Sequence, residues 1–376
     1  MEKIKLPIKE LIIAFILMFA GGAFGSYILA DITFSHSYEY GFIDYILILA
    51  GLVLAVWFSI ITHELGHLFY GRLTGYSFVS FRIGSLMLIK NKDGFRVKRF
   101  TLKGTGGQCL MTPQCSENKN IPYALFNLGG VLFNLFFTGV FFIIFVLFNN
   151  VPVLSQIVII FALISLFSAI LNGVPLSVEG IDNDGANVRS LYKSKKARRA
   201  FAIQLMINAE LSKGTSITDM PKEWFELPSD SDLDNALVAT LAVFHMNRLL
   251  AERRFDECRA LIRKYLEKKT AMLGIHRSLL MLDAIYIDLI TQGDVADVSS
   301  FYTAEMTNLM KAMKSFPSVQ RTRYAVALIK DKNENMAENI KQSFEKTAKS
   351  YPYESDAICE RGLMDIALHT YLEGRG

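Results

Sequence analysis

The chain has 376 residues, of which 51% are hydrophobic and 20% charged, with a net charge of +4 and a mean hydropathy of +0.29. It is too long for one small domain and too apolar for an ordinary soluble protein, so the composition indicates a membrane protein. The small positive charge is explained by basic residues beside membrane segments, so we expect no nucleic-acid partner. Apolar residues crowd the first half and charged residues follow from about residue 190, which predicts a membrane domain and then a soluble domain.

Four apolar stretches are long enough to cross a bilayer, which takes about 20 mostly apolar residues. They cover residues 11–32, 42–71, 122–148 and 153–174. The first follows three lysines and contains the small-residue patch AGGAFGS, so a cleaved signal peptide is an alternative to a retained helix. The apolar run continues beyond that patch to Ala30, which favours a retained helix.

Basic residues set the orientation of these helices. They gather after the second stretch and after the fourth, whereas the loop at residues 149–156 has none. By the positive-inside rule the two basic regions are cytoplasmic. The first group is Arg72, Arg82, Lys90, Lys92, Arg96, Lys98, Arg99 and Lys103, and the second is Lys193, Lys195, Lys196, Arg198 and Arg199.

The second stretch contains the sequence HELGH near its cytoplasmic end. On a helix His63 and His67 project from one face, where two imidazoles can bind one zinc ion with Glu64 beside the metal-bound water. The alternative is a set of buried polar residues that ties helices together. Ionisable groups within a membrane helix are costly and usually mark a functional site, which favours the metal interpretation.

A catalytic zinc ion normally has a third protein ligand. Two carboxylates, Asp182 and Asp184, follow the fourth apolar stretch at the membrane depth expected for HELGH. An ordinary polar turn that caps the next helix would also explain them. The four cysteines show neither a CxxC nor a Cys/His spacing, and we interpret them as free thiols.

Taken together, these residues resemble the signature of the site-2 protease family of intramembrane zinc metalloproteases. That signature is HExxH on one core helix and Asn-x-x-Pro followed by Asp-Gly on another. Two further stretches, GGVLFN and LKGTGGQCLM, look like the family's asparagine-bearing helix and its Gly-Gly loop, and the resemblance covers about residues 51–187. The matching signature residues are His63, Glu64, His67, Asn172, Pro175, Asp184 and Gly185.

The resemblance implies a role for each of these residues. Zn²⁺ would be bound by His63, His67 and Asp184, and Glu64 would act as the general base and acid in peptide hydrolysis. Asp184 is favoured over Asp182 because Gly185 follows it. Asn134 and Asn172 are candidates for positioning the substrate, with a helix-to-helix hydrogen bond as an equally good explanation for both.

The loop after HELGH has an Asp-Gly turn at Asp93 and Gly94 between two runs of partly alternating apolar and basic residues. This pattern predicts a β-hairpin. An exposed strand edge could pair with an extended substrate, and either residues 84–90 or residues 95–102 could offer it. The family resemblance implies a hairpin that dips into the membrane, and a basic hairpin resting on anionic headgroups is the alternative.

The second half of the chain shows apolar residues at helical spacing. A stretch resembling the start of the second helix of a tetratricopeptide-like repeat follows Arg253, so an array that binds a protein partner is one interpretation and a plain helical bundle the other. A polar connector is expected at residues 213–234. Helices are expected within residues 235–268, as a pair joined near 253–255, and at 278–291, 304–315, 318–329, 333–350 and 356–372.

The sequence thus predicts an α-helical polytopic membrane protein with about four spans, one membrane-associated hairpin at about residues 80–110, and an all-α soluble C-terminal domain. The division is a transmembrane metalloprotease domain at residues 1–192 and a cytosolic domain at residues 193–376. The expected function is cleavage of a membrane-embedded peptide or protein near the cytoplasmic face of the cell membrane. The alternative is a catalytically inactive membrane scaffold that recruits partners through the C-terminal domain.

Overall fold

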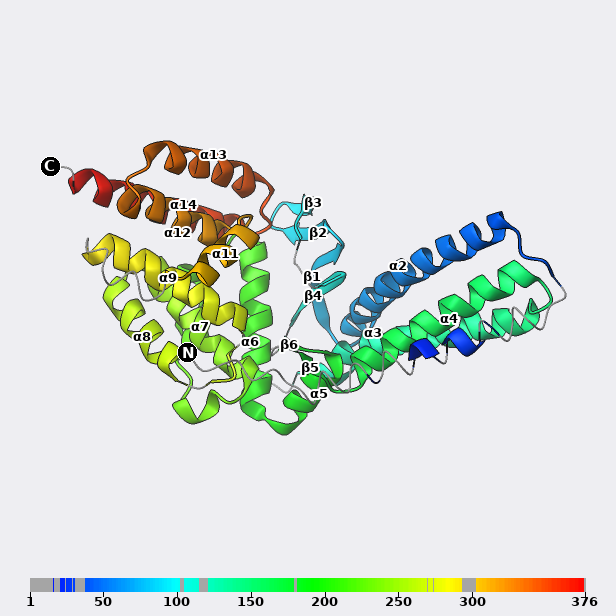
Figure 1. Ribbon diagram of the computed structural model, residues 1–376. Helices are drawn as coiled ribbons and strands as arrows, with labels where there is room; N and C mark the ends of the chain where they lie inside the picture. Colours follow the sequence, from blue (N-terminus) through cyan, green and yellow to red (C-terminus); the bar gives the residue numbers. More distant parts are fainter. Residues whose placement is uncertain are drawn as a thin grey trace. The chain divides into compact units, whose positions relative to one another are not determined.

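The computed structural model describes residues 38–101, 105–114, 121–178, 181–268, 270–272, 274–292 and 302–374, with residues 16, 21–23, 25–28 and 30 near the N-terminus. The described chain is mostly helical and forms two compact units (Figure 1). One comprises residues 1–84 and 102–198, and the other residues 85–101 and 199–376. Whether residues 1–192 and 193–376 are separate domains stays a prediction, because compactness alone does not establish independent folding.

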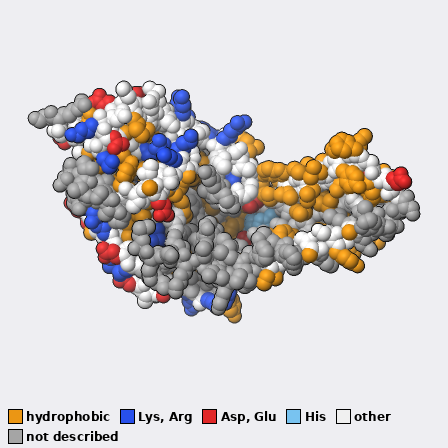
Figure 2. Space-filling view, in the orientation of Figure 1, with side chains coloured by type: hydrophobic (Ala, Val, Ile, Leu, Met, Phe, Trp, Pro, Cys, Tyr) orange, Lys and Arg blue, Asp and Glu red, His pale blue; other side chains and the backbone are white. Residues whose placement is uncertain are grey.

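Three helices of the first unit are long and apolar enough to cross a membrane, which indicates a multi-pass membrane protein. They are α2 (Phe42–Leu73), α3 (Tyr123–Leu147) and α4 (Pro152–Gly173), each within two residues of the predicted bounds. Many large hydrophobic side chains of these helices are exposed, and Figure 2 shows patches of hydrophobic side chains on the visible face of the bundle, as expected for helices that face lipid. The predicted first span lies almost entirely outside the described residues.

Helices α2, α3 and α4 pack against one another in pairs. Small residues permit the closest approach, because a Cβ atom added to Gly66 would meet the backbone carbonyl of Gly129. Farther along the bundle, Phe58 packs edge-to-face on Phe137 at 5.1 Å between ring centroids. The close crossing at Gly66 brings the HELGH turn of α2 directly against α3.

Four antiparallel strands follow α2, namely β1 (Tyr76–Ile83), β2 (Leu86–Asn91), β3 (Gly94–Arg99) and β4 (Gly107–Pro113), in the spatial order β3-β2-β1-β4. The predicted hairpin is confirmed by the pairing of β2 with β3, which closes with Asn91 opposite Gly94. The sequence did not predict the long pair of β1 with β4. Of the two strands proposed to offer an open edge, β2 is therefore interior and only β3 lies at an edge, with β4 at the other.

A short link joins α4 to the next helix. Strands β5 (Ser177–Val178) and β6 (Ile181–Asp182) pair in it, and α5 (Asp184–Lys193) follows at once. Asn183 caps α5 by accepting a hydrogen bond from the Ala186 amide at 2.9 Å. The cap fixes where α5 begins and therefore where Asp184 points.

Helix α6 (Lys195–Ser212) leads into the second unit, whose described helices follow the predicted runs. Helices α7 (Ala236–Ala251) and α8 (Phe255–Glu267) are joined at Arg253, which has a φ of +64°. The predicted connector at residues 213–234 contains three short 3₁₀ turns, Ile217–Asp219, Lys222–Phe225 and Asp230–Asp232. The remaining elements are α9 (Gly274–Gln292), α11 (Ala304–Ala312), α12 (Pro317–Ala325), a π-helical turn (Val326–Lys330), α13 (Glu334–Ser350) and α14 (Glu354–Glu373).

The β2–β3 hairpin belongs to this second unit and packs on its helices. Phe100, just after β3, makes edge-to-face contacts with Phe316 and Tyr351. Lys98 Nζ donates a hydrogen bond to the Lys349 carbonyl at 2.9 Å. These contacts anchor the end of β3 on the helical unit.

Candidate metal centre

Three side chains from α2 and α5 converge on one point, and we call His63, His67 and Asp184 the metal cluster. The His63 and His67 Nε2 atoms lie 3.2 Å apart, and Asp184 Oδ2 lies 3.1 Å from the first and 3.4 Å from the second. Tetrahedral zinc, with bonds of about 2.0–2.1 Å, places neighbouring ligand atoms about 3.3 Å apart. The donor set and its spacing therefore fit a zinc ion.

Backbone and side-chain contacts orient the two imidazoles. His67 Nδ1 lies 2.8 Å from the Phe126 carbonyl of α3, a position in which an Nδ1–H donates and leaves Nε2 free for a metal. His63 lies against Gly130, where an added Cβ would collide with the imidazole ring. The glycines of the GGVLFN stretch thus make room for the histidines.

Asp184 stands at the first position of α5. The Asn183 side chain donates to the carbonyls of Leu171 and Val174, each at 2.6 Å, and so ties the start of α5 to the end of α4. Burial alone would raise the pKa of Asp184, but the two neighbouring imidazoles, His63 and His67, outweigh it and lower the pKa to about 2. The carboxylate is therefore ionised at neutral pH, as a zinc ligand must be.

Asp182, the alternative ligand, is the last residue of β6 and pairs with Ser177 through its backbone. It does not join the metal cluster, which among the described residues contains only His63, His67 and Asp184. The geometry therefore favours Asp184.

Glu64 is 8% exposed and lies next to the ligands on α2, facing the loop that leads into β4. A Cβ atom added to Gly107 would lie 2.6 Å from Glu64 Cγ, so this loop approaches the carboxylate as only glycine permits. The Cys109 backbone lies close to the Glu64 carboxylate. The first residues of strand β4 therefore line the Glu64 side of the metal cluster.

Arg82 holds this loop in place. It is fully buried, and its guanidinium donates to the carbonyls of Gly84 at 2.7 Å and Gly107 at 3.2 Å. Sequence reasoning counted Arg82 only among the basic residues that set topology. No local sequence signal distinguishes Arg82 from the exposed basic residues around it.

The two candidate asparagines have different surroundings. Asn134 is fully buried, and its Nδ2 lies 2.8 Å from Ser168 Oγ and 3.4 Å from His63 Nδ1. Its Oδ1 accepts from Thr62 Oγ1 at 3.0 Å. Asn172 instead donates to the Ser168 carbonyl of its own helix at 2.9 Å. Sequence reasoning did not single out Thr62, Ser168 or the Phe126 carbonyl, because no motif marks them.

A family model described as "Peptidase family M50" matches residues 51–359, most of the chain. No curated protein and no solved structure matches this chain.

Proposed function

Because the chain belongs to peptidase family M50, a family of zinc metalloendopeptidases, we propose that it hydrolyses a peptide bond in a membrane-spanning or signal-peptide-derived segment. The observation that carries this proposal is the metal cluster, with its three ligand atoms 3.1–3.4 Å apart and Glu64 beside it. The family resemblance noted in the sequence, to site-2 proteases, agrees with this assignment.

The proposed topology has four spans, with residues 11–32 as a retained first helix. Basic residues after α2 and after α4 support a cytoplasmic location for the ends of these helices. The metal cluster would then lie near the cytoplasmic membrane face. The second unit would lie in the cytoplasm, where its helices could bind a protein partner.

Zinc bound at this cluster would lower the pKa of a water molecule and polarise the substrate carbonyl. Glu64 takes the proton of the attacking water and returns it to the leaving nitrogen. The close approach of Gly107 puts the Glu64 carboxylate beside the start of β4. Asn134 lies beside His63 and helps to position it, and Asn172, whose Nδ2 donates within its own helix, offers its Oδ1 to the substrate backbone.

The substrate must be extended, since a peptide bond within a helix is shielded by its hydrogen bonds. Strand β4 pairs with β1 on one side and borders Glu64 at its start. A substrate strand added along the free side of β4 would pass Glu64 with its backbone exposed. We therefore assign substrate pairing to β4 and leave the β2–β3 hairpin as a membrane-associated element.

The direct test is Glu64→Gln, assayed by co-expression with a panel of membrane peptides. The variant should lose cleavage of any peptide that the native chain cuts and retain about one zinc per chain, because the carboxylate serves the water and not the metal. Glu39→Gln, at an exposed glutamate before α2, is the matched control and should cleave normally. Full turnover by Glu64→Gln would refute the mechanism.

Cross-linking separates the two sheet edges. In the inactive Glu64→Gln chain, a photo-reactive residue at Gln108 on β4 should capture a bound substrate. The same residue at Val97 on β3, whose side chain is 63% exposed, should not. Capture from Val97 alone would move substrate pairing to the hairpin.

The alternative, an inactive scaffold, makes the opposite prediction. Such a chain would leave every peptide of the panel intact, and Glu64→Gln would retain partner recruitment by the second unit unchanged. The intact ligands and Glu64 argue against it, since a chain that has lost catalysis has no need to keep all four.

A further inference from the structure

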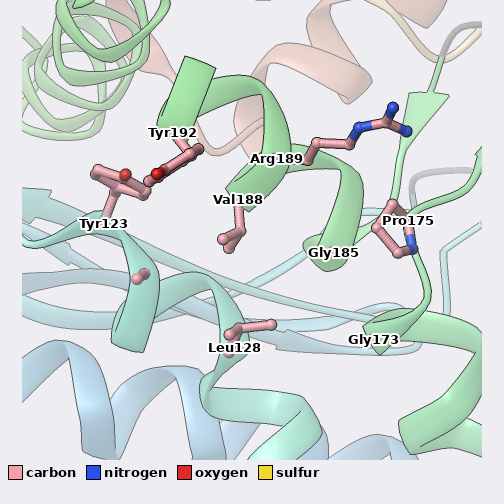
Figure 3. Close-up of a pocket in the computed structure, with 9 residues that line it drawn as sticks. Tyr123, Leu128, Gly173, Pro175, Gly185, Val188, Arg189 and Tyr192 are labelled. Carbon is pink, nitrogen blue, oxygen red and sulfur yellow. The ribbon is translucent and has the colours of Figure 1, made fainter. Parts of the chain in front are cut away.

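A hollow of about 370 Å³ lies between the start of α3, the end of α4 and the exposed side of α5 (Figure 3). Such a volume falls at the lower end of ligand sites, which span about 300–1,000 Å³. Its walls are largely apolar, with one charged residue among them. The residues that define it are Tyr123, Leu128, Pro175, Val188, Arg189 and Tyr192.

This hollow is distinct from the catalytic centre. None of its lining residues is a metal ligand, and none comes from α2 or from β4, where Glu64 and the proposed substrate edge lie. It nevertheless borders the metal cluster through α5, because Gly185 lines it and immediately follows Asp184. A Cβ atom added to Gly185 would collide with the Gly173 carbonyl, so this end of α5 is pressed onto the end of α4.

The hollow lies at the depth of a membrane surface. Tyr123 begins one membrane span and Gly173 ends another, so the hydrocarbon core begins at this level. Figure 3 shows Val188 and Leu128 pointing into the hollow, which Tyr123 and Tyr192 also line. Tyrosine is enriched at this level of a bilayer, because its ring sits among headgroups while its body contacts acyl chains.

One arginine lines the rim, and the chain that follows it is basic. Arg189 is exposed and forms no hydrogen bond or ion pair with any described residue, and its guanidinium stands at the rim in Figure 3. Between Gly185 and Arg199 the chain has six lysines and arginines and no carboxylate. Arg198 lies over the Tyr123 ring at 5.8 Å. A ligand that fits must combine an apolar chain with a negative charge at the membrane surface.

We propose that this hollow binds an anionic phospholipid, with one acyl chain against Leu128 and Val188 and the phosphate on Arg189. Apolar walls favour the chain, and the excess of cations favours an anionic over a zwitterionic headgroup. The bound lipid supports the outer side of α5, whose first residue is Asp184. The inference does not depend on the proposed peptidase activity.

Lipid retention by the full-length protein tests this proposal. Native mass spectrometry of protein released from micelles containing phosphatidylglycerol or phosphatidylcholine with the same acyl chains should show one phosphatidylglycerol retained at least about tenfold more often. Val188→Phe fills the hollow and should abolish this retention. Val146→Phe, at the far end of α3 with a side chain 54% exposed, is the matched control and should retain the lipid.

Arg189→Gln should remove the preference for phosphatidylglycerol, whereas Arg72→Gln, at an exposed arginine ending α2, should leave it intact. Zinc content and thermal unfolding serve to show that each variant folds, and Leu128→Phe replaces Val188→Phe if the latter does not. Displacement of the lipid by inorganic phosphate at millimolar concentration would overturn the proposal, since the headgroup charge would then suffice. Equal retention of phosphatidylglycerol by Val188→Phe and Val146→Phe would also overturn the proposal. So would a Val188→Phe variant that keeps the lipid and changes only which peptide bond is cleaved, because the hollow would then be a substrate subsite.

Discussion

The metal cluster and the cluster around Arg321 are both buried sets of charged groups, but only one contains its own cation. Arg321 is fully buried in the helical unit, donates to Asp283 and to Glu360, and lies over the Tyr286 ring at 4.3 Å. In the metal cluster three electron-pair donors converge, and no lysine or arginine of the described chain forms an ion pair with Asp184. Acceptors that converge without a protein cation are the donor set of a metal ion.

This difference separates a site for chemistry from a site for stability. The Arg321 cluster satisfies its charges within the chain, as a buried structural network must. The metal cluster takes its ligands from α2 and from α5, and each ligand is oriented by contacts on α3 or at the end of α4. Changes in the first cluster should therefore affect folding, and changes in the second should affect metal binding.

The largest expected effect is the loss of zinc on removing a ligand. Asp184→Ala should reduce zinc from about one per chain to a trace and abolish cleavage, as should His63→Ala and His67→Ala. Asp182→Ala is the matched control, because Asp182 lies outside the metal cluster. This variant should keep both its zinc and its cleavage activity. The zinc content of each purified variant is measured by mass spectrometry. Loss of zinc from Asp182→Ala alone would make Asp182, and not Asp184, the third ligand.

The next largest effect is a loss of stability on changing the Arg321 cluster. Arg321→Met leaves Asp283 and Glu360 without their buried partner and should lower the free energy of unfolding of the helical unit by about 3–5 kcal/mol. Trp224 reports this unfolding in a Trp57→Phe background, since the chain has only these two tryptophans. Lys341→Met, at an exposed lysine of α13, should change stability little. Zinc loss from folded Arg321→Met would break the separation between the clusters.

The smallest expected effect concerns Asn134. Asn134→Ala removes the side chain that lies beside His63 Nδ1 and should weaken zinc binding by up to about 10-fold, because Asn134 Nδ2 is a donor and not the acceptor that a ligand's Nδ1–H usually has. Asn172→Ala should leave zinc affinity unchanged, because its amide bonds within its own helix. Competition with a zinc chelator measures both affinities, and equal values for the two variants would assign Asn134 a purely structural role.

Much of the membrane unit could be predicted from the sequence because its signals are local. An apolar run of fixed length bounds a span, and the four-residue spacing of His63 and His67 defines a helical face. The C-terminal helices and the turn at Arg253 follow equally from local periodicity. In each case neighbouring residues carry the whole pattern.

The parts that could not be predicted depend on contacts between distant residues. Strand β1 pairs with β4 some thirty residues later, and only that pairing makes β1 an interior strand and places β4 at the edge of the sheet. Arg82 carries the same charge as the surface arginines around it, and only the folded loop shows that it is buried against carbonyls. The His63–Asn134 contact likewise requires α2 and α3 to be packed first.

X-ray absorption at the zinc edge of the purified native protein tests the central claim most directly. A site made by His63, His67 and Asp184 predicts only nitrogen and oxygen neighbours at about 2.0–2.2 Å, in a signal that Asp184→Ala loses. A sulfur neighbour at about 2.3 Å would contradict the account, because it would bring a cysteine such as Cys109 into the ligand set. The absence of zinc from folded native protein supplied with the metal would contradict it equally.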